Sequence, residues 1–269
     1  SIGVAAAPLH GGTASELLRH ANAALYSAKA SGRNRVELFD GAMQKELVDR
    51  LEGEQALRRA IDDGEIFAFF QPEIDASTGH IVGAELLARW VRRSGQVTPA
   101  NDFLSLAASA GLLERITEKV IISARPHMQR LALLGLPDGF RFRINMAPEA
   151  TEHSWRDDPI DQMLQGLDPA WVTIDIAESA VSVDLLAAAA NLAAFRARGG
   201  RVCLDDFARG VSSLSLLRRL PLDEVRIDRL SIDTITAHPH DRAIVRSIIA
   251  LVREIGFAVT ADGVETGAQ

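Results

Sequence analysis

Two adjacent carboxylates, Asp205 and Asp206, end a short apolar run that begins at Arg201. Gly199 and Gly200 stop the helix before this run, so the run is predicted to be a β-strand. Neighbouring side chains of a strand point to opposite faces, but both carboxylates can serve one cavity if the chain turns where the strand ends. Like charges this close need a cation or hydrogen bonds to compensate them. Taken alone, this dipeptide therefore has two interpretations: part of a metal site, or a pair of solvated loop aspartates.

Other predicted strands also carry polar groups near their ends. In an α/β barrel the carboxyl ends of the strands converge on one mouth, where active sites lie. Carboxylate and amide oxygens are the preferred ligands of hard divalent cations such as Mg²⁺, Mn²⁺ and Ca²⁺. The sequence thus predicts an oxygen-rich metal site, whose candidate ligands are Glu85, Asn145, Asp175, Asp205 and Asp206.

The elements that must position these residues alternate between strands and helices from residue 66 onward. Strands are predicted over 67–74, 81–91, 140–146, 171–176, 201–207, 224–228 and 257–264, and helices over 100–110, 112–134, 185–198, 213–219 and 241–255. This alternation implies a parallel sheet with helical crossovers. About seven strands in roughly two hundred residues favour a TIM-like α/β barrel over an open sheet.

The first 63 residues precede this alternating pattern. Residues 1–40 are predicted to form a strand, a helix opened by a capping box from Thr13 to Glu16, and a second strand over 35–39. So short a piece cannot bury a core alone, so we expect it to be the end of an upstream domain. Residues 41–63 form a charged amphipathic helix, for which a connecting role competes with a dimer-forming or signal-relaying role.

The composition is that of a soluble globular protein with a sizeable core, since 47% of the residues are hydrophobic and 24% are charged. The net charge of −7 argues against nonspecific nucleic-acid binding, which needs a basic surface. No apolar run has the length of a membrane span, and no signal peptide is visible. Cys203 is the only cysteine and lies in an apolar strand, so we expect a buried thiol and a reducing, cytoplasmic setting.

A series of short motifs follows the predicted strands in order: Gln71-Pro72, the segment from Gly83 to Trp90, Asn145, Asp205-Asp206-Phe207, Ile227-Asp228 and Gly263 to Thr266. Together they resemble the EAL family, the cyclic di-GMP phosphodiesterases. The resemblance implies a modified TIM barrel whose first strand runs antiparallel to its neighbour. It also implies hydrolysis of one phosphodiester bond of cyclic di-GMP to linear pGpG with Mg²⁺ or Mn²⁺, whereas Ca²⁺ is expected to bind without supporting turnover.

The beginning of the chain, Ser1 to Val4 and residues 21–36, resembles the C-terminal end of a GGDEF (diguanylate cyclase) domain. The part that would carry the signature of that family is missing, so no cyclase activity is expected here. We therefore expect a GGDEF fragment over 1–40, a connecting helix over 41–63, and an EAL domain over 64–269 that stops before its last helix and strand. Besides cyclic di-GMP, the expected partners are an upstream GGDEF and sensory domain in the same polypeptide and a second copy of the chain.

The resemblance also implies a role for each matching residue. The metal ligands would be Glu85, Asn145, Asp175 and Asp205. Asp206 corresponds to the acid that serves the second metal and the attacking water.

Further positions correspond to groups around the substrate. Gln71 and Arg89 correspond to residues that hold the dinucleotide, Arg89 by its charge on phosphate. Glu178 corresponds to the Glu that steadies the loop after the Asp-Asp pair. Arg226 and Asp262 stand at the remaining two catalytic positions.

Three of these positions depart from the family pattern: Asp175 and Asp262 replace Glu, and Arg226 replaces Lys. The loop over 208–211 differs as well. Each shorter acid keeps its charge, but a displacement of about 1 Å can lower a rate on the order of a hundredfold. Arg226 cannot deprotonate and directs its donors differently from Lys. The sequence thus leaves two hypotheses, an active phosphodiesterase and a degenerate EAL domain that binds cyclic di-GMP or a protein partner.

Overall fold

The computed structural model describes residues 1–147, 164, 166–178, 185–207 and 213–269. The loop over 208–211, which departs from the family pattern, lies outside these residues. No helix in the described part of the chain is long and apolar enough to cross a membrane.

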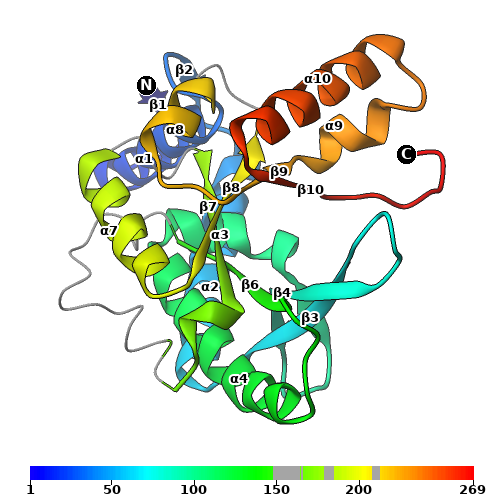
Figure 1. The fold of residues 1–269 in the computed structure, drawn as a ribbon. Helices are drawn as coiled ribbons and strands as arrows, with labels where there is room; N and C mark the ends of the chain where they lie inside the picture. The colour runs from blue at the N-terminus through cyan, green and yellow to red at the C-terminus, as the bar shows by residue number, and fades with distance from the viewer. Residues whose placement is uncertain (148–163, 165, 179–184, 208–212) are drawn as a thin grey trace.

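Within the described residues, one eight-stranded sheet frames the larger part of the molecule (Figure 1). Its strands are β3 Ile66–Ile74, β4 Ile81–Val91, β5 Val97–Pro99, β6 Arg141–Asn145, β7 Val172–Ala177, β8 Arg201–Phe207, β9 Glu224–Ile227 and β10 Ala258–Ala261. They lie in the order β10-β9-β8-β7-β6-β4-β3, and β5 pairs with β4. β3 is antiparallel to β4, whereas β4 is parallel to β6 and the strands from β6 to β10 are mutually parallel. The predicted antiparallel first strand and parallel sheet are confirmed.

The sheet curls into a half barrel with β3 and β10 at its two edges (Figure 1). The helices that connect and cover its strands are η1 Ala100–Asp102, α3 Leu104–Ser109, α4 Leu113–Leu133, η3 Pro169–Trp171, α7 Leu185–Ala197, α8 Ser213–Arg219, α9 Arg229–Thr234 and α10 Pro239–Ile255. β5 and α9 were not predicted from the sequence. Asp228 accepts a hydrogen bond from the Leu230 backbone N–H at 3.1 Å and caps α9, so this strand-end acid serves a helix.

The core lies between the outer face of the half barrel and these helices. On β6 Phe142 and Ile144 are buried, and on β7 Ile174 and Ile176 are buried. Helix α4 packs on β3 and β4 and buries an i, i+4 stripe that includes Val120. Because strand side chains alternate between two faces, the residues between the buried apolar ones point to the inside of the half barrel.

The first forty residues form a strand, a helix and a strand, as predicted. These are β1 Ile2–Val4, α1 Ala14–Ala30 and β2 Val36–Leu38, with β1 parallel to β2 and the predicted capping box between Thr13 and Glu16 in place. Helix α2 Gly41–Asp62 follows.

Helix α2 contacts two separate apolar clusters. Met43 and Leu47 near its start pack against a small cluster around Phe39, whereas Leu57 and Ile61 near its end are fully buried in the main core. This arrangement agrees with a connecting helix, although the division of the chain into three domains stays a prediction.

Gly83 allows β6 to approach β4 closely at the start of the Gly-Ala-Glu motif. A Cβ at this position would lie 2.8 Å from the Arg141 carbonyl oxygen and 2.8 Å from a Glu73 carboxylate oxygen. Gly83→Ala is therefore expected to lower the free energy of unfolding by about 1–3 kcal/mol, because the strands must separate. Urea denaturation measures the change, and Gly41→Ala is the control because a Cβ there meets nothing within 4 Å. Equal effects of the two substitutions would contradict the close-approach explanation.

Candidate active site

Polar side chains fill the inside of the half barrel because they occupy alternate positions of neighbouring strands. The inward positions near the carboxyl ends of the parallel strands carry Glu85 on β4, Asn145 on β6, Asp175 on β7, Asp205 on β8 and Arg226 on β9. Asp262 directly follows β10. The structure therefore brings the predicted acids together at the end where the parallel strands finish, which we call the mouth.

The guanidinium group of Arg226 lies among these acids. Its Nη2 donates to Glu85 Oε2 at 2.6 Å, and its Nη1 donates to Asp175 Oδ2 at 2.9 Å. Its Nε is 3.9 Å from Asp205 Oδ1, and its Nη2 is 3.7 Å from Asp262 Oδ1, which are distances of ion pairs and not of hydrogen bonds. Arg226 is only 8% exposed, and among the described residues its Nε has no hydrogen-bond partner.

Glu85 is held from two sides. In addition to Arg226, the Asn145 amide nitrogen donates to Glu85 Oε1 at 2.8 Å. Burial acts to raise the pKa of Glu85, but the hydrogen bond and the charge of Arg226 outweigh it, so the pKa lies below its ordinary value. Glu85 is therefore an ionised, hydrogen-bonded carboxylate inside the protein.

A second buried guanidinium, that of Arg143, lies deeper in the half barrel, and no role was predicted for it from the sequence. It donates to Asp175 Oδ1 at 2.7 Å and to Glu224 Oε1 at 2.7 Å, and it forms an ion pair with Glu73. Asp175 thus lies between two arginines, with one oxygen bound to each. Complete burial raises the pKa of Asp175 to about 7, and the charges of Arg143 and Arg226 oppose that rise.

The Asp205-Asp206 pair lies in a β-bulge. The register between β8 and β9 shifts between Leu204 and Phe207, and Asp206 has a left-handed backbone with a φ of 56°. The Asp206 N–H donates to Asp205 Oδ1 at 2.8 Å. Burial raises the pKa of Asp205 and the adjacent Asp206 charge adds to that rise, whereas the charge of Arg226 opposes it. The chain therefore turns where the two carboxylates occur, which frees them from strict strand alternation.

The backbone of Asp206 predicts a difference between two substitutions. A left-handed conformation costs most L-residues about 1–2 kcal/mol, and Asn tolerates it better than Ala. Asp206→Asn should therefore be more stable than Asp206→Ala by about 1 kcal/mol, although both lack the carboxylate. Thermal unfolding of the two variants measures this difference. If Asp206→Ala were the more stable of the two, the left-handed backbone at this position would be contradicted.

The residues predicted to hold the dinucleotide lie on β3 and β4. Gln71 pairs with Glu85 in the β3–β4 register and is exposed. Arg89 lies four residues beyond Glu85 on the same strand face, where its guanidinium donates to the Ala88 carbonyl at 2.9 Å and lies 5.7 Å from the centre of the Phe69 ring. Glu178 follows the end of β7. The roles of these residues stay predictions.

The donor set at the mouth fits a hard divalent cation by its chemistry, since it consists of carboxylates and one amide. The acids of this set, however, are arranged around the guanidinium of Arg226. Within the described ranges, no three Asp, Glu, His or Cys side chains converge on one metal position. Arg226 thus compensates the negative charge that a metal ion would otherwise compensate.

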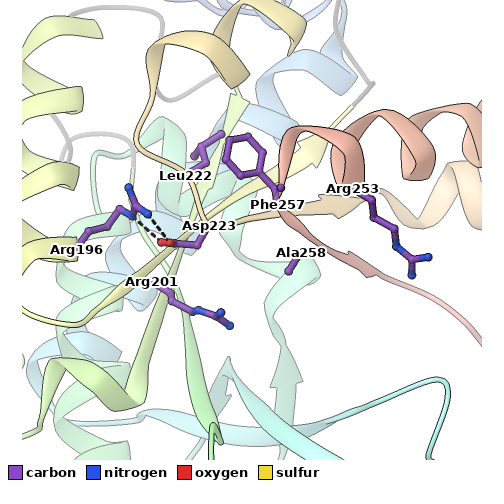
Figure 2. A pocket seen from close by; sticks show the side chains of 8 residues that line it. Arg196, Arg201, Leu222, Asp223, Arg253, Phe257 and Ala258 are labelled. Atoms are coloured by element: carbon purple, nitrogen blue, oxygen red, sulfur yellow. Dashed lines mark hydrogen bonds and ion pairs between the residues drawn. The ribbon is translucent and has the colours of Figure 1, made fainter.

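A pocket of about 450 Å³ lies at the other end of the parallel strands (Figure 2). Its lining comes from residues that precede or begin β8, β9 and β10: Arg196, Arg201, Leu222, Asp223, Arg253, Gly256, Phe257 and Ala258. Arg196 donates to both carboxylate oxygens of Asp223, at 2.9 and 2.6 Å. The pocket is separate from the acids at the mouth, so its residues offer control positions for tests of the site.

Known proteins resemble this chain in sequence and in fold. Residues 54–269 match the EAL domain family. The chain is 35% identical over 272 residues to the bifunctional diguanylate cyclase/cyclic di-GMP phosphodiesterase MucR of Pseudomonas aeruginosa, and the alignment covers 100% of this chain and 39% of MucR. It is 30% identical to the cyclic di-GMP phosphodiesterase NbdA of the same organism, over 100% of this chain and 34% of NbdA. The chain therefore spans less than half the length of these two relatives.

A solved structure gives the same result. The PaMucR phosphodiesterase in complex with c-di-GMP superimposes with a TM-score of 0.73 at 32% identity, and the alignment covers 81% of this chain and 88% of that structure. The EAL-type α/β fold that the motifs implied is thereby confirmed.

Proposed function

The chain belongs to the EAL domain family, and on that basis we propose that it binds cyclic di-GMP at the mouth of the half barrel and hydrolyses one phosphodiester bond to give linear pGpG. The observation that carries the proposal is the convergence of Glu85, Asn145 and Asp205 with Asp206 at one end of the parallel strands. The named cyclic di-GMP phosphodiesterases among the relatives support the substrate.

The proposed reaction breaks the bond between phosphorus and one 3′ oxygen of the ring. A water oxygen attacks the phosphorus, the 3′ oxygen leaves and takes a proton, and the product keeps a 5′ phosphate. Asp206 orients the attacking water and accepts its proton. Arg89 and Gln71 hold the dinucleotide, Arg89 through its charge on phosphate. Mg²⁺ or Mn²⁺ held by Glu85, Asn145, Asp175 and Asp205 would supply positive charge and lower the pKa of a water.

A second candidate function is a binding module that holds cyclic di-GMP, or a protein partner, without hydrolysing it. The position of Arg226 favours this candidate, because its guanidinium is hydrogen-bonded to two of the five predicted metal ligands. Asp262 favours the same candidate, because its side chain is one methylene shorter than the Glu of the family. Its carboxylate lies 3.7 Å from Arg226 and so does not reach hydrogen-bond distance.

Chromatography of cyclic di-GMP after incubation with the domain and Mn²⁺ distinguishes the two candidates. If the chain is a phosphodiesterase, we expect pGpG from the unmodified chain. We expect more pGpG from Asp262→Glu, which restores the longer acidic side chain of the family at this position. If the unmodified chain gave no product while Asp262→Glu did, the hydrolytic proposal would fail for the natural sequence. Calorimetry with cyclic di-GMP in Ca²⁺ then tests binding alone, and an absence of heat would leave a protein-interaction role.

We further propose that residues 1–40 are the end of a GGDEF domain and that α2 links it to the EAL domain. The alignment with MucR, which covers the whole chain, supports this proposal because the name of MucR includes a diguanylate cyclase. An upstream sensory domain, a homodimer and a cytoplasmic location stay predictions.

A further inference from the structure

We infer that Arg226 is a built-in cation of the acid cluster, which competes with divalent metal ions for the same oxygens. In this protein a metal ion would bind only when the guanidinium moves away. The inference rests on the acid cluster that the proposed function uses, but it does not require turnover.

The carboxylate oxygens of Glu85 and Asp175 already accept hydrogen bonds. One oxygen of Glu85 accepts from Asn145 at 2.8 Å and the other accepts from Arg226 at 2.6 Å. One oxygen of Asp175 accepts from Arg143 at 2.7 Å and the other from Arg226 at 2.9 Å. All four oxygens of these two carboxylates therefore already accept a hydrogen bond, and one oxygen of each is held by the positively charged guanidinium of Arg226, which repels a metal ion.

Arg226 also offsets the negative charge of the acid cluster. The carboxylates of Glu85, Asp175, Asp205 and Asp262 all lie within 4 Å of Arg226 nitrogens, between 2.6 and 3.9 Å. The attraction of this acid cluster for positive charge is the force that draws a divalent cation into such a site, and the charge of Arg226 already satisfies part of it. A guanidinium also stays ionised at every ordinary pH, so deprotonation cannot remove this competitor.

The fit of the guanidinium is incomplete, which makes its displacement feasible. The Arg226 Nε is buried without a hydrogen-bond partner among the described residues, and Asp205 and Asp262 lie beyond hydrogen-bond distance. A lysine at this position would present one compact ammonium on a flexible stem, which can turn toward a single acid and leave the other acids to a metal ion. The arginine thus sets the metal affinity of this particular domain.

Isothermal titration calorimetry with Mn²⁺ on the full chain tests the inference. Arg226→Lys is expected to bind Mn²⁺ about tenfold more tightly than the unmodified protein, a difference of about 1.4 kcal/mol. Arg253→Lys makes the same chemical change at the pocket in Figure 2, at the opposite end of the strands, and should leave the affinity unchanged. Equal or weaker Mn²⁺ binding by a folded Arg226→Lys variant would overturn the inference.

Thermal unfolding provides a second readout. Mn²⁺ at a concentration that raises the Tm of Arg226→Lys should raise the Tm of the unmodified protein less, because the stabilisation by a ligand grows with the ratio of its concentration to its dissociation constant. If Arg226→Lys does not fold, Arg226→Gln, which removes the charge and keeps a donor amide, takes its place in both measurements, with tighter Mn²⁺ binding as the expected result. Absence of pGpG from every variant would defeat the proposed hydrolysis but not this inference, whereas equal Mn²⁺ affinities would defeat the inference even in an active enzyme.

Discussion

Replacing Arg143 with alanine is expected to lower the free energy of unfolding by about 3–5 kcal/mol, the range measured when one partner of a buried ion pair is removed. The Arg143 side chain is 3% exposed and contacts three carboxylates, those of Glu73, Asp175 and Glu224. Alanine would leave Glu224 with a hydrogen bond from Thr260 and Asp175 with Arg226 alone. The negative charges of these two buried acids would then lack the positive charge of Arg143.

Equilibrium urea denaturation followed by circular dichroism measures this loss. Arg93→Ala is the matched control, because the Arg93 side chain is 79% exposed and forms an ion pair with the exposed Asp63. Its other partner, Glu65, keeps a hydrogen bond from Trp90 when Arg93 is removed. Exposed pairs of this kind contribute about 0–1 kcal/mol, so the control should change stability little. A similar small effect of both substitutions would show that Arg143 does not hold the buried acids together.

The order of strands and helices could be predicted because each leaves a local pattern. Apart from β5, the strands from β3 to β10 and the longer helices lie where apolar runs and helical spacing indicated. β5 and α9 were missed because elements of three and six residues are too short to show a period. Asp228 shows a related limit, since a strand-end acid and a helix cap have the same appearance in the sequence.

The contents of the site could be predicted only in part. That the acids meet at one mouth followed from the parallel strands, but which charges pair depends on the register of strands that are far apart in the sequence. Arg143 lies 81 residues before Glu224, and Glu85 lies 141 residues before Arg226. No local pattern connects such partners. One signal for the buried arginine was present in the sequence. Arg143 lies two positions before Asn145, so both side chains point to the same, inner face of β6.

The second prediction with a large effect concerns Glu85. Under the proposed function, Glu85→Gln should lower the rate of cyclic di-GMP hydrolysis by about 10²–10³-fold, the range for loss of one preorganised electrostatic contact in an active site. Gln is nearly isosteric, so the change removes the charge and not the shape. Dissociation constants for cyclic di-GMP should change less than the rate, because Gln71 and Arg89 are the groups assigned to the dinucleotide.

The same substitution has a consequence that does not depend on turnover. Glu85 is 7% exposed and accepts from Arg226 at 2.6 Å, so Gln would leave the buried guanidinium with one charged hydrogen-bond partner, Asp175. A weakened buried charged hydrogen bond costs about 1.5–3 kcal/mol, which urea denaturation detects. Arg253→Lys, at the opposite end of the strands, should change neither the rate nor the stability appreciably. A Glu85→Gln variant with unchanged stability would show that Arg226 does not depend on Glu85, and one with an unchanged rate would remove Glu85 from the proposed catalytic site.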